Sequence, residues 1–418
     1  VNYSCVKEWN QRIQKTANHY NTANTIPCFT DIYNDSANTH TLVWNGQTHY
    51  GVAVEWQIDL CNRVGADLWI NIPATATSDF ERQLALLIKA QLDTSLKVYV
   101  EWANEVWNWN FSSTVYARNM ADSLRLDTLN YGGAYMLPWR AYTVYASVRA
   151  FEQFENVFGK NSPRIVKVIA GQVGYHWNGY DYNHMVNGDL AALNNRIVNP
   201  NSVSIDAYAM APYMGGSTIA AQRAALSGDA QYMRWAKNSL NGTSIKLICY
   251  EAGADNYPDQ TLVLTRDIAQ EQLNFDYLAM LDDYCQGPVN QYCMYGGCWG
   301  LKNYPGESEA NAPKWRGWLN YWGGFSVKSE EPGRTALMSS PSSPSGFSPN
   351  PVSGCLNIVL RKHETADLRI IDIKGRVLIR KRIIGGTNRI SLLQYPTGVY
   401  ILEIDKKATI TREKLVVL

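Results

Sequence analysis

The chain has 418 residues, of which 46% are hydrophobic and 18% are charged, and its formal net charge is +1. This composition excludes a disordered chain, and the small net charge provides no overall field to attract nucleic acid or an anionic membrane. The length exceeds that of one ordinary core, so we expect two domains or one barrel with an appendage. No run of about 18 apolar residues occurs, so no membrane span is expected.

Tyrosine and tryptophan are unusually frequent in the chain. It contains 14 Trp and 26 Tyr but only 9 Phe. Both side chains join an apolar ring to a polar tip, which suits a wet groove that stacks ring-shaped molecules. A large aromatic core is the alternative interpretation, and many of these residues must serve that purpose.

The eight cysteines lack the paired Cys-x-x-Cys spacing of a zinc site. The Gly-rich segment 285–300 also lacks the spacing and the lysine of a phosphate-binding loop. We therefore expect no metal and no cofactor. Cys293 and Cys298 flank a short turn and are candidates for a bridge, whereas Cys61 and Cys249 lie in apolar segments and are expected to be buried thiols.

Short apolar strands alternate with helical patterns over the first three quarters of the chain. This alternation predicts parallel strands with helices packed outside them, in a doubly wound sheet or a closed (β/α)₈ TIM barrel. In either fold, chemistry takes place at the carboxyl ends of the strands. Residues 2–9 are the candidate for an earlier strand, and a barrel that lacks its first strand or strands is the alternative to a complete one. The predicted strands are 66–73, 96–103, 164–172, 203–213, 244–253 and 291–300.

The composition changes near residue 327, where Ser, Pro and Gly begin to dominate, as in a linker. Short strands separated by turns follow, without any helical pattern, which predicts a small all-β sandwich. The predicted domains are therefore an α/β barrel at 1–326, a linker at 327–349 and a β-sandwich at 350–418.

Polar and aromatic residues stand at the predicted carboxyl ends of the strands. Two of them, Glu105 and Glu251, directly follow apolar strands and would face one pocket in a closed barrel. Paired carboxylates suit glycosidic cleavage, in which one acts as an acid with a raised pKa and the other attacks the sugar or activates water. Two independent strand-end acids are the alternative. The other strand-end residues are Asn71, Asn104, Gln172, Tyr213 and Trp299.

The segment WANEVWN, followed later by CYEAG, resembles the pattern of glycoside hydrolase clan A, a clan of (β/α)₈ barrels. The resemblance implies Glu105 as the acid/base, Asn104 as the neighbour that binds the sugar 2-hydroxyl, and Glu251 as the nucleophile. It further implies Tyr213, in APYMGG, as a tyrosine near the nucleophile. Trp299, in GGCWG, matches the tryptophan beneath the cleaved sugar.

The roles of the glutamates require different protonation states. Ionised Glu251 should raise the pKa of Glu105 by repulsion, and burial among nearby tryptophans should raise it further. When Glu251 becomes a neutral ester, the repulsion ends and Glu105 can act as a base. The tryptophans near Glu105 in the sequence are Trp102, Trp107 and Trp109.

Aromatic residues near the glutamates are candidates for stacking on sugar rings. We expect one of Trp107 and Trp109 to face a groove and the other to belong to the core. The polar, aromatic segment GYHWNGYDYNH at 174–184, which contains Trp177, is a stronger groove candidate. The expected substrate-binding set is Asn71, Asn104, Trp107, Gln172, Trp177, Tyr213 and Trp299.

The C-terminal seventy or so residues closely resemble the type A sorting domain of Bacteroidota type IX secretion. The resemblance rests on the Asn-Pro opening of SPNPVSGCLNIVL, the hairpin of LRIIDIKGRVL and the strand GVYILEI. It implies contact with the type IX machinery, export across the outer membrane, and a secreted or cell-surface location.

Together these features predict a secreted retaining endo-glycosidase that acts on a β-linked plant polysaccharide. A β-1,4-glucan, as for a cellulase, is the first choice, and xylan and mannan follow. A non-catalytic glycan-binding surface protein is the alternative from another class. A peptidase or esterase has no support, because no Gly-x-Ser-x-Gly elbow is present.

Overall fold

The computed structural model describes most of the chain, and its residues gather into two compact units. The first unit comprises Val1–Pro212, Gln231–Ala252 and Cys285–Asn290, and the second comprises Tyr213–Ala230, Gly253–Tyr284 and Gln291–Leu418. The described residues are 6–15, 29–34, 39–44, 52–256, 262–322, 346–348, 355–372, 375–392, 395–406 and 410–417.

A parallel sheet forms the centre of the first unit. Its strands follow the order β3 (Leu68–Ile72), β4 (Val98–Trp102), β5 (Ile165–Ala170), β6 (Ala207–Met210) and β8 (Lys246–Asp255). Each neighbouring pair is parallel. These strands lie within or overlap the predicted segments, so the prediction of a parallel α/β fold of the TIM-barrel type is confirmed.

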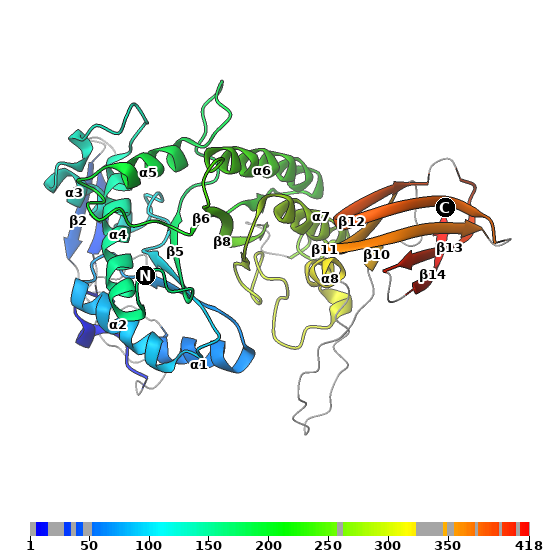
Figure 1. The fold of residues 1–418 in the computed structure, drawn as a ribbon, viewed down its shortest axis with the longest axis horizontal. Coiled ribbons are helices and arrows are strands. Elements are labelled where there is room, and N and C mark those ends of the chain that lie inside the picture. Colours follow the sequence, from blue (N-terminus) through cyan, green and yellow to red (C-terminus); the bar gives the residue numbers. More distant parts are fainter. Residues whose placement is uncertain are drawn as a thin grey trace. The chain divides into compact units, whose positions relative to one another are not determined.

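Helices connect these strands and cover one face of the sheet (Figure 1). In chain order they are α1 (Val54–Val64), α2 (Ser78–Gln91), α3 (Ser112–Ser123), α4 (Pro138–Phe158) and α5 (His184–Asn194). The long helix α4 packs against α2, α3 and α5 and against β4 and β5. Its central position makes it the main support of the strands that carry the candidate site.

The ends of these helices follow local sequence signals. The Thr77 hydroxyl accepts a hydrogen bond from Phe80 N and caps the start of α2. Helix α4 has Pro138 at its first position, where the missing N–H costs nothing. Gly65 ends α1 in the left-handed conformation, with φ of 66°.

The two faces of the sheet differ in character. Val98, Val100 and Trp102 alternate along β4 on the helix side, and the Trp102 ring meets Tyr142 of α4 edge-on at 5.5 Å. The intervening side chains, Tyr99 and Glu101, lie on the opposite face. An apolar cluster there includes small alanines on the central strands. Its buried members are Val168, Ala170, Ala207, Ala209, Ile248 and Tyr250.

A buried polar network fixes the carboxyl ends of β5 and β6. The Arg140 guanidinium pairs with the Asp189 carboxylate and donates to Ala170 O at 2.8 Å. The Tyr208 hydroxyl donates to the same carboxylate at 2.7 Å. Gly171 leaves room for that hydroxyl, because a Cβ there would lie 2.2 Å from Tyr208 Oη. The network therefore joins two strands to α4 and α5.

The second unit begins with β7 (Tyr213–Gly215), which pairs with residues 253–255 of β8. Helix α6 (Ile219–Ser239) follows, and α7 (Ala269–Tyr284) packs against α8 (Pro313–Tyr321). Phe275 and Tyr321 meet across the α7 and α8 contact with their ring centroids 5.5 Å apart.

The predicted strand at 291–300 is wrong. The structure has only the short strand β9 (Val289–Gln291) there, and turns follow it. Gly296 and Gly297 have φ values of 115° and 50°. Both values are incompatible with a continuous strand, so the apolar run was interrupted by its own glycines.

The C-terminal module is an antiparallel sheet, as predicted. Its strands are β10 (Gly346–Ser348), β11 (Cys355–Asp372), β12 (Val377–Ser391), β13 (Gly398–Asp405) and β14 (Ile410–Val417). The order is β10-β11-β13-β14, and β12 also pairs with β11. Strand β11 therefore has partners along both halves of its length.

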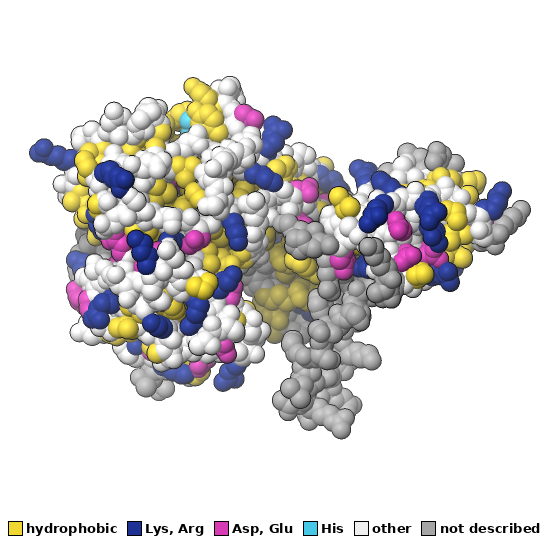
Figure 2. Space-filling model, viewed as in Figure 1, with side chains coloured by type: hydrophobic (Ala, Val, Ile, Leu, Met, Phe, Trp, Pro, Cys, Tyr) yellow, Lys and Arg dark blue, Asp and Glu magenta, His cyan; other side chains and the backbone are white. Residues whose placement is uncertain are grey.

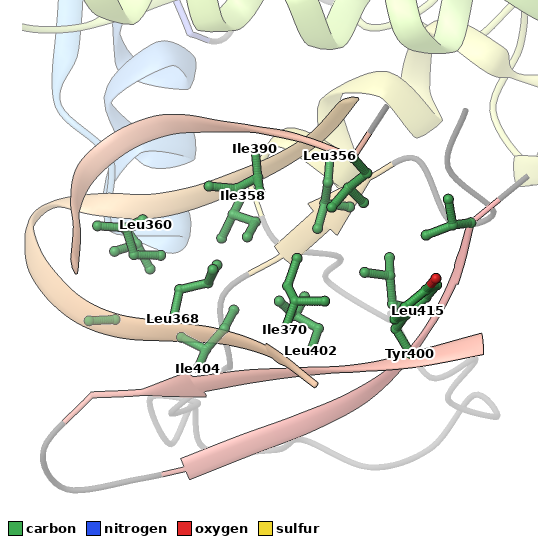
Figure 3. Close-up of a cluster of buried hydrophobic side chains, with 14 residues drawn as sticks. Leu356, Ile358, Leu360, Leu368, Ile370, Ile390, Tyr400, Leu402, Ile404 and Leu415 are labelled. Carbon is green, nitrogen blue, oxygen red and sulfur yellow. The ribbon is translucent and has the colours of Figure 1, made fainter. Parts of the chain in front are cut away.

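Alternating apolar side chains of this module meet in one core. Figure 3 shows Leu356, Ile358 and Leu360 from β11 directed toward side chains from the later strands. The hairpin after β11 is closed by Asp372, whose Oδ1 accepts from Arg376 N at 2.9 Å. Gly375 has φ of 80°, which this tight turn requires. The Asp-x-x-Gly pattern in the sequence thus has a specific structural role.

The start of the chain contains an antiparallel hairpin that the sequence pattern did not indicate, made of β1 (Phe29–Asn34) and β2 (Thr39–Trp44). Residues 2–5 of the candidate strand at 2–9 lie outside the described residues; the described part, 6–9, is not a strand, and a 3-10 helix, Trp9–Gln11, stands at its end. The proposed linker also lies almost entirely outside them, so the domain boundaries remain a prediction.

The mixed surface charge and the absence of a long apolar helix among the described residues agree with the small net charge and the apolar pattern of the sequence. On the face shown in Figure 2, lysine and arginine side chains are scattered among acidic, polar and apolar ones. Among the residues that the structure describes, no helix is both long enough and apolar enough to cross a membrane.

Candidate active site at the strand ends

The turn that follows β4 has an unusual backbone. Ala103 and Glu105 both have positive φ, at 56° and 48°, which is uncommon for residues with a side chain. Ala103 N donates to Ile72 O at 2.9 Å, which continues the pairing with β3 to this point. Strained backbone of this kind costs about 1–3 kcal/mol per residue and gathers at functional sites.

Several bonds hold the Glu105 residue in that conformation. Its carbonyl accepts from Trp107 N at 2.6 Å and from Asn108 N at 2.9 Å. Its carboxylate accepts from Asn108 Nδ2 at 3.0 Å. The Thr114 hydroxyl, on α3, donates to Asn108 O at 2.8 Å. The carboxylate is therefore aimed by both the turn and the helix after it.

A third glutamate, absent from the expected site, lies inside β4. Glu101 is 2% exposed and accepts a hydrogen bond from Trp69 Nε1 at 2.8 Å. Burial raises the pKa of Glu101 to about 8; hydrogen bonds from Trp69 and Asn71 oppose the shift, and the charges of Glu251 and Glu105 add to it. Glu101 is therefore predominantly protonated at neutral pH.

Asn71, one of the predicted binding residues, is part of this support. Its Nδ2 donates to Ala103 O at 3.1 Å, and it also interacts with Glu101. Asn71 thus links β3 to the strained turn and to the buried carboxyl. In the structure its polar groups face protein partners.

Tyr250, on β8, is the residue that unites the three carboxyls. It is 6% exposed, and burial together with the charges of Glu105, Glu251 and Glu101 raises its pKa well above the ordinary value. Its hydroxyl lies beside Trp107. Neither Tyr250 Oη nor Trp107 Nε1 has a well-aligned hydrogen-bond partner in the part of the chain that the structure describes. The hydroxyl also lies near the Glu105 carboxyl, so a ligand that bound these donors would compete with groups of the site itself.

Glu251 lies within β8 rather than after its end. Residues 246–249 pair with β6, residues 253–255 pair with β7, and Glu251 stands between the two paired stretches. The strand continues past it because β7 supplies a second partner. The charge of Glu251 reaches Glu101 and Tyr250, so the structure brings Glu105 and Glu251 into one electrostatic neighbourhood.

The pKa of Glu105 is raised above its ordinary value. Burial is the main cause, and the Asn108 amide and the Tyr250 hydroxyl oppose it. The expected repulsion from Glu251 instead acts on Glu101 and Tyr250. Glu101 therefore takes up part of the charge interaction that the sequence pattern assigned to Glu105.

The three nearby tryptophans have different surroundings. Trp102 packs on Tyr142 on the helix side of the sheet, and Trp109 packs edge-on against Trp139 of α4 at 4.7 Å. Both belong to the helix packing. Trp107 lies beside Tyr250, so it is the member of the Trp107 and Trp109 pair that stands in the candidate site.

The segment after β5 presents aromatic rings to solvent. Trp177 is 40% exposed and lies edge-on to Tyr135 with centroids 4.5 Å apart, and Tyr180 is 50% exposed. Asn183 Nδ2 supports the segment by donating to Gln172 O at 3.0 Å. Gln172 therefore contributes through its backbone to the shape of this loop.

The remaining predicted residues differ in location. Asn104 is half-buried beside Glu105. Tyr213 and Trp299 belong to the second unit, whereas the glutamates belong to the first. Within the second unit Tyr292 lies between them, with ring centroids 6.0 Å from Tyr213 and 6.2 Å from Trp299. The structure therefore brings these two predicted residues into one aromatic group.

A cavity of about 400 Å³ opens at the opposite edge of the sheet, at the amino ends of the strands. Three of its charged side chains, those of Lys167, Glu155 and Asp206, already have protein partners. Lys167 pairs with Glu155 at 2.7 Å, and Asp206 accepts from Lys167 N at 2.8 Å. This edge supports stability in barrels of this type, so the strand ends near Glu105 remain the better candidate.

The described residues contain no group of three or more His, Cys, Asp or Glu side chains that could hold a metal ion.

Comparison with known families identifies the C-terminal module. Residues 347–418 match the family model described as a secretion system C-terminal sorting domain. The module is a type IX secretion sorting domain, as its resemblance implied. Proteins that carry it are exported to the cell surface or the extracellular space, and this chain carries the same export signal.

The rest of the chain has only distant likenesses. A search of curated protein sequences finds no match. A Cellulomonas fimi endo-β-1,4-mannanase double mutant is 10% identical, with 82% of this chain and 69% of that chain covered and a TM-score of 0.37. A β-mannanase of family GH26 from Bacteroides ovatus is 10% identical, with 62% and 81% covered and a TM-score of 0.28. Likenesses this weak transfer no activity.

The buried Glu101 carboxyl should make stability depend on pH. Its folded pKa, about 8, lies above its ordinary value of 4.5, so its contribution is present below 4.5 and is lost as pH rises through 8. In urea titrations between these limits, Glu101→Gln should remove a pH-dependent component of up to about 1.4 kcal/mol per pH unit.

Glu81→Gln is the matched comparison for this variant, because burial also raises the pKa of Glu81, on α2, to about 8. It should remove a similar component of the pH dependence. If Glu101→Gln leaves the wild-type pH dependence intact, Glu101 is ionised in the folded protein and the description above is wrong.

Proposed function

We propose that this protein is a secreted retaining endo-glycosidase that hydrolyses a β-linked plant polysaccharide, with β-1,4-glucan as the first substrate to test and xylan and mannan next. One observation carries the proposal. Glu105 and Glu251 share an electrostatic neighbourhood with a buried tyrosine, and Glu105 has a raised pKa. The export module fits an enzyme that meets a polymeric glycan outside the cell.

In the first chemical step, the Glu251 carboxylate attacks the anomeric carbon. The glycosidic bond breaks, and its electron pair stays on the leaving oxygen, which takes the proton of Glu105. In the second step, Glu105, now ionised, removes a proton from water while the water oxygen displaces Glu251. The two inversions give net retention, and both glutamates return to their starting states.

Glu101 would keep Glu251 ionised. Three carboxyls in one partly buried region cannot all carry charge at low cost, and the most buried of them retains its proton. A neutral Glu101 therefore leaves the negative charge to Glu251. The Tyr250 hydroxyl can donate to Glu251 or to the bound sugar as charge develops during the reaction.

The binding roles follow from the shape and polarity of each side chain. Asn104 is proposed to bind the 2-hydroxyl of the cleaved sugar, and Trp107 to donate through its indole N–H. Trp177 offers an exposed face on which a pyranose ring can stack. Tyr213 and Trp299, in the aromatic group of the second unit, are proposed as further sugar-binding residues. Open aromatic loops favour internal cleavage of a polymer over removal of terminal sugars.

Substitution of the two glutamates tests these roles. Glu251→Ala should lower reducing-sugar release from its polymer by about 10³-fold or more, because the nucleophile is lost. Glu105→Ala should lose about 10²- to 10⁴-fold on the same polymer but retain activity on aryl glycosides with good leaving groups. Added azide should restore turnover of those aryl glycosides by Glu105→Ala, with retained configuration.

Glu81→Gln serves as the control, because it changes a buried carboxyl outside the site and should leave reducing-sugar release unchanged. Equal release by wild type and Glu251→Ala on every polymer would contradict the proposal. Polymer binding without any release by the wild type would instead indicate a non-catalytic glycan-binding protein.

The hydrogen bond from the Asn108 amide should lower the highest pH at which the protein is active. Its donation to Glu105 favours the ionised form, so Asn108→Ala should raise the pKa of Glu105 further. Because the acid acts while protonated, the alkaline limb of the kcat/KM profile should move to higher pH. A limb that stays in place, or moves to lower pH, would remove Glu105 from the acid role.

A further inference from the structure

Two buried cysteines face each other, and one of them is on β8, the strand that carries Tyr250 and Glu251. Cys249 lies on β8, Cys285 directly follows α7, and their Sγ atoms are 3.5 Å apart. Cys249 is fully buried and Cys285 is 4% exposed. Burial and the neighbouring Cys285 raise the pKa of Cys249, so it is a poor nucleophile or metal ligand in the folded protein. A structural role suits this pair better than a reactive one.

The backbone holds the two cysteines together on both sides. Gln286 N donates to Leu247 O at 2.8 Å, and Cys249 N donates to Pro288 O at 3.0 Å. Gly287 packs closely on Ile248, since a Cβ there would lie 2.7 Å from that side chain. The segment after Cys285 is therefore fixed along β8, and the two thiols cannot move apart without breaking these contacts.

We propose that Cys249 and Cys285 form a disulfide bond in the exported protein. The separation of 3.5 Å exceeds the length of an S–S bond, about 2.05 Å, so the two sulfurs move about 1.5 Å closer when the bond forms. The sorting module sends the chain to a compartment in which disulfides form and persist.

The reaction needs a two-electron acceptor, which is the disulfide of an oxidoreductase or of glutathione. One thiolate attacks that disulfide and forms a mixed disulfide, and one thiol of the acceptor leaves. The second cysteine thiolate then attacks its partner's sulfur and releases the other thiol. The two cysteines lose two protons and two electrons, and the acceptor gains them. Both thiols are buried in the final fold, so the bond forms before folding is complete.

The bond would act on the strand that carries Glu251. Cys249 stands two residues before it on β8, and the two cysteines are 36 residues apart in the chain. The loop that the bond closes contains Gly253–Tyr284, a segment of the second unit. The bond therefore ties the residue that follows this segment, Cys285, to β8. Closing a loop of this length stabilises a fold chiefly by limiting the unfolded chain.

Differential alkylation tests the pairing directly. The full chain is folded with reduced and oxidised glutathione, denatured without reductant and treated with N-ethylmaleimide, then reduced and treated with iodoacetamide. Cys249 and Cys285 should carry the second reagent, and the unreduced digest should contain their two peptides joined. Cys61 is a half-buried free thiol, so its prediction as a buried one was wrong, and it should carry the first reagent. N-ethylmaleimide on Cys249 and Cys285 would overturn the proposal, including when Cys293 and Cys298 are paired instead.

Thermal unfolding provides a second readout. Wild type refolded with a phosphine reductant should melt about 5–10 °C lower than the oxidised protein. The double variant Cys249→Ala, Cys285→Ala should melt at one temperature with or without reductant, and Cys61→Ser should respond as wild type does. An unchanged wild-type melting temperature, with reduction verified by mass, would contradict a stabilising bond.

Discussion

The cost of burying carboxyl groups beside one another determines how the candidate site works. Glu101, Glu105 and Glu251 all act on the buried Tyr250 hydroxyl, and water cannot screen them fully. The structure reduces the charge by keeping a proton on Glu101, held by the Trp69 indole and the Asn71 amide. The proton on Glu101 thus lowers the charge that Glu105 and Glu251 meet in the same small volume.

Rigid surroundings keep this arrangement in place. The turn with positive φ at Ala103 and Glu105 is held by bonds from β3 and from the residues before α3. The pair of Arg140 and Asp189 fixes the ends of the neighbouring strands to α4 and α5. Strained backbone and buried charge therefore occur together near the strand ends, which is typical of sites that bind or transform a ligand.

Most of the architecture was predictable because parallel strands buried on both faces are written as short apolar runs between helical patterns. The all-β tail was predictable from its turns, such as the one closed by Asp372 and Gly375. Glu101 was missed because it lies inside an apolar run, although its two-residue spacing from Tyr99 placed it on the interior face. The separate environments of Trp107 and Trp109 depend on β8 and α4, which lie too far along the chain for a local pattern to reveal.

The central claim is that Glu251 attacks a sugar while Glu105 supplies the proton. The most direct measurement is the intact mass of the protein after incubation with a panel of 2-deoxy-2-fluoroglycosides that carry good leaving groups, followed by peptide mapping. The account predicts the addition of one glycosyl unit, located on Glu251. An adduct on another carboxyl, or turnover of these compounds without any adduct, would contradict it.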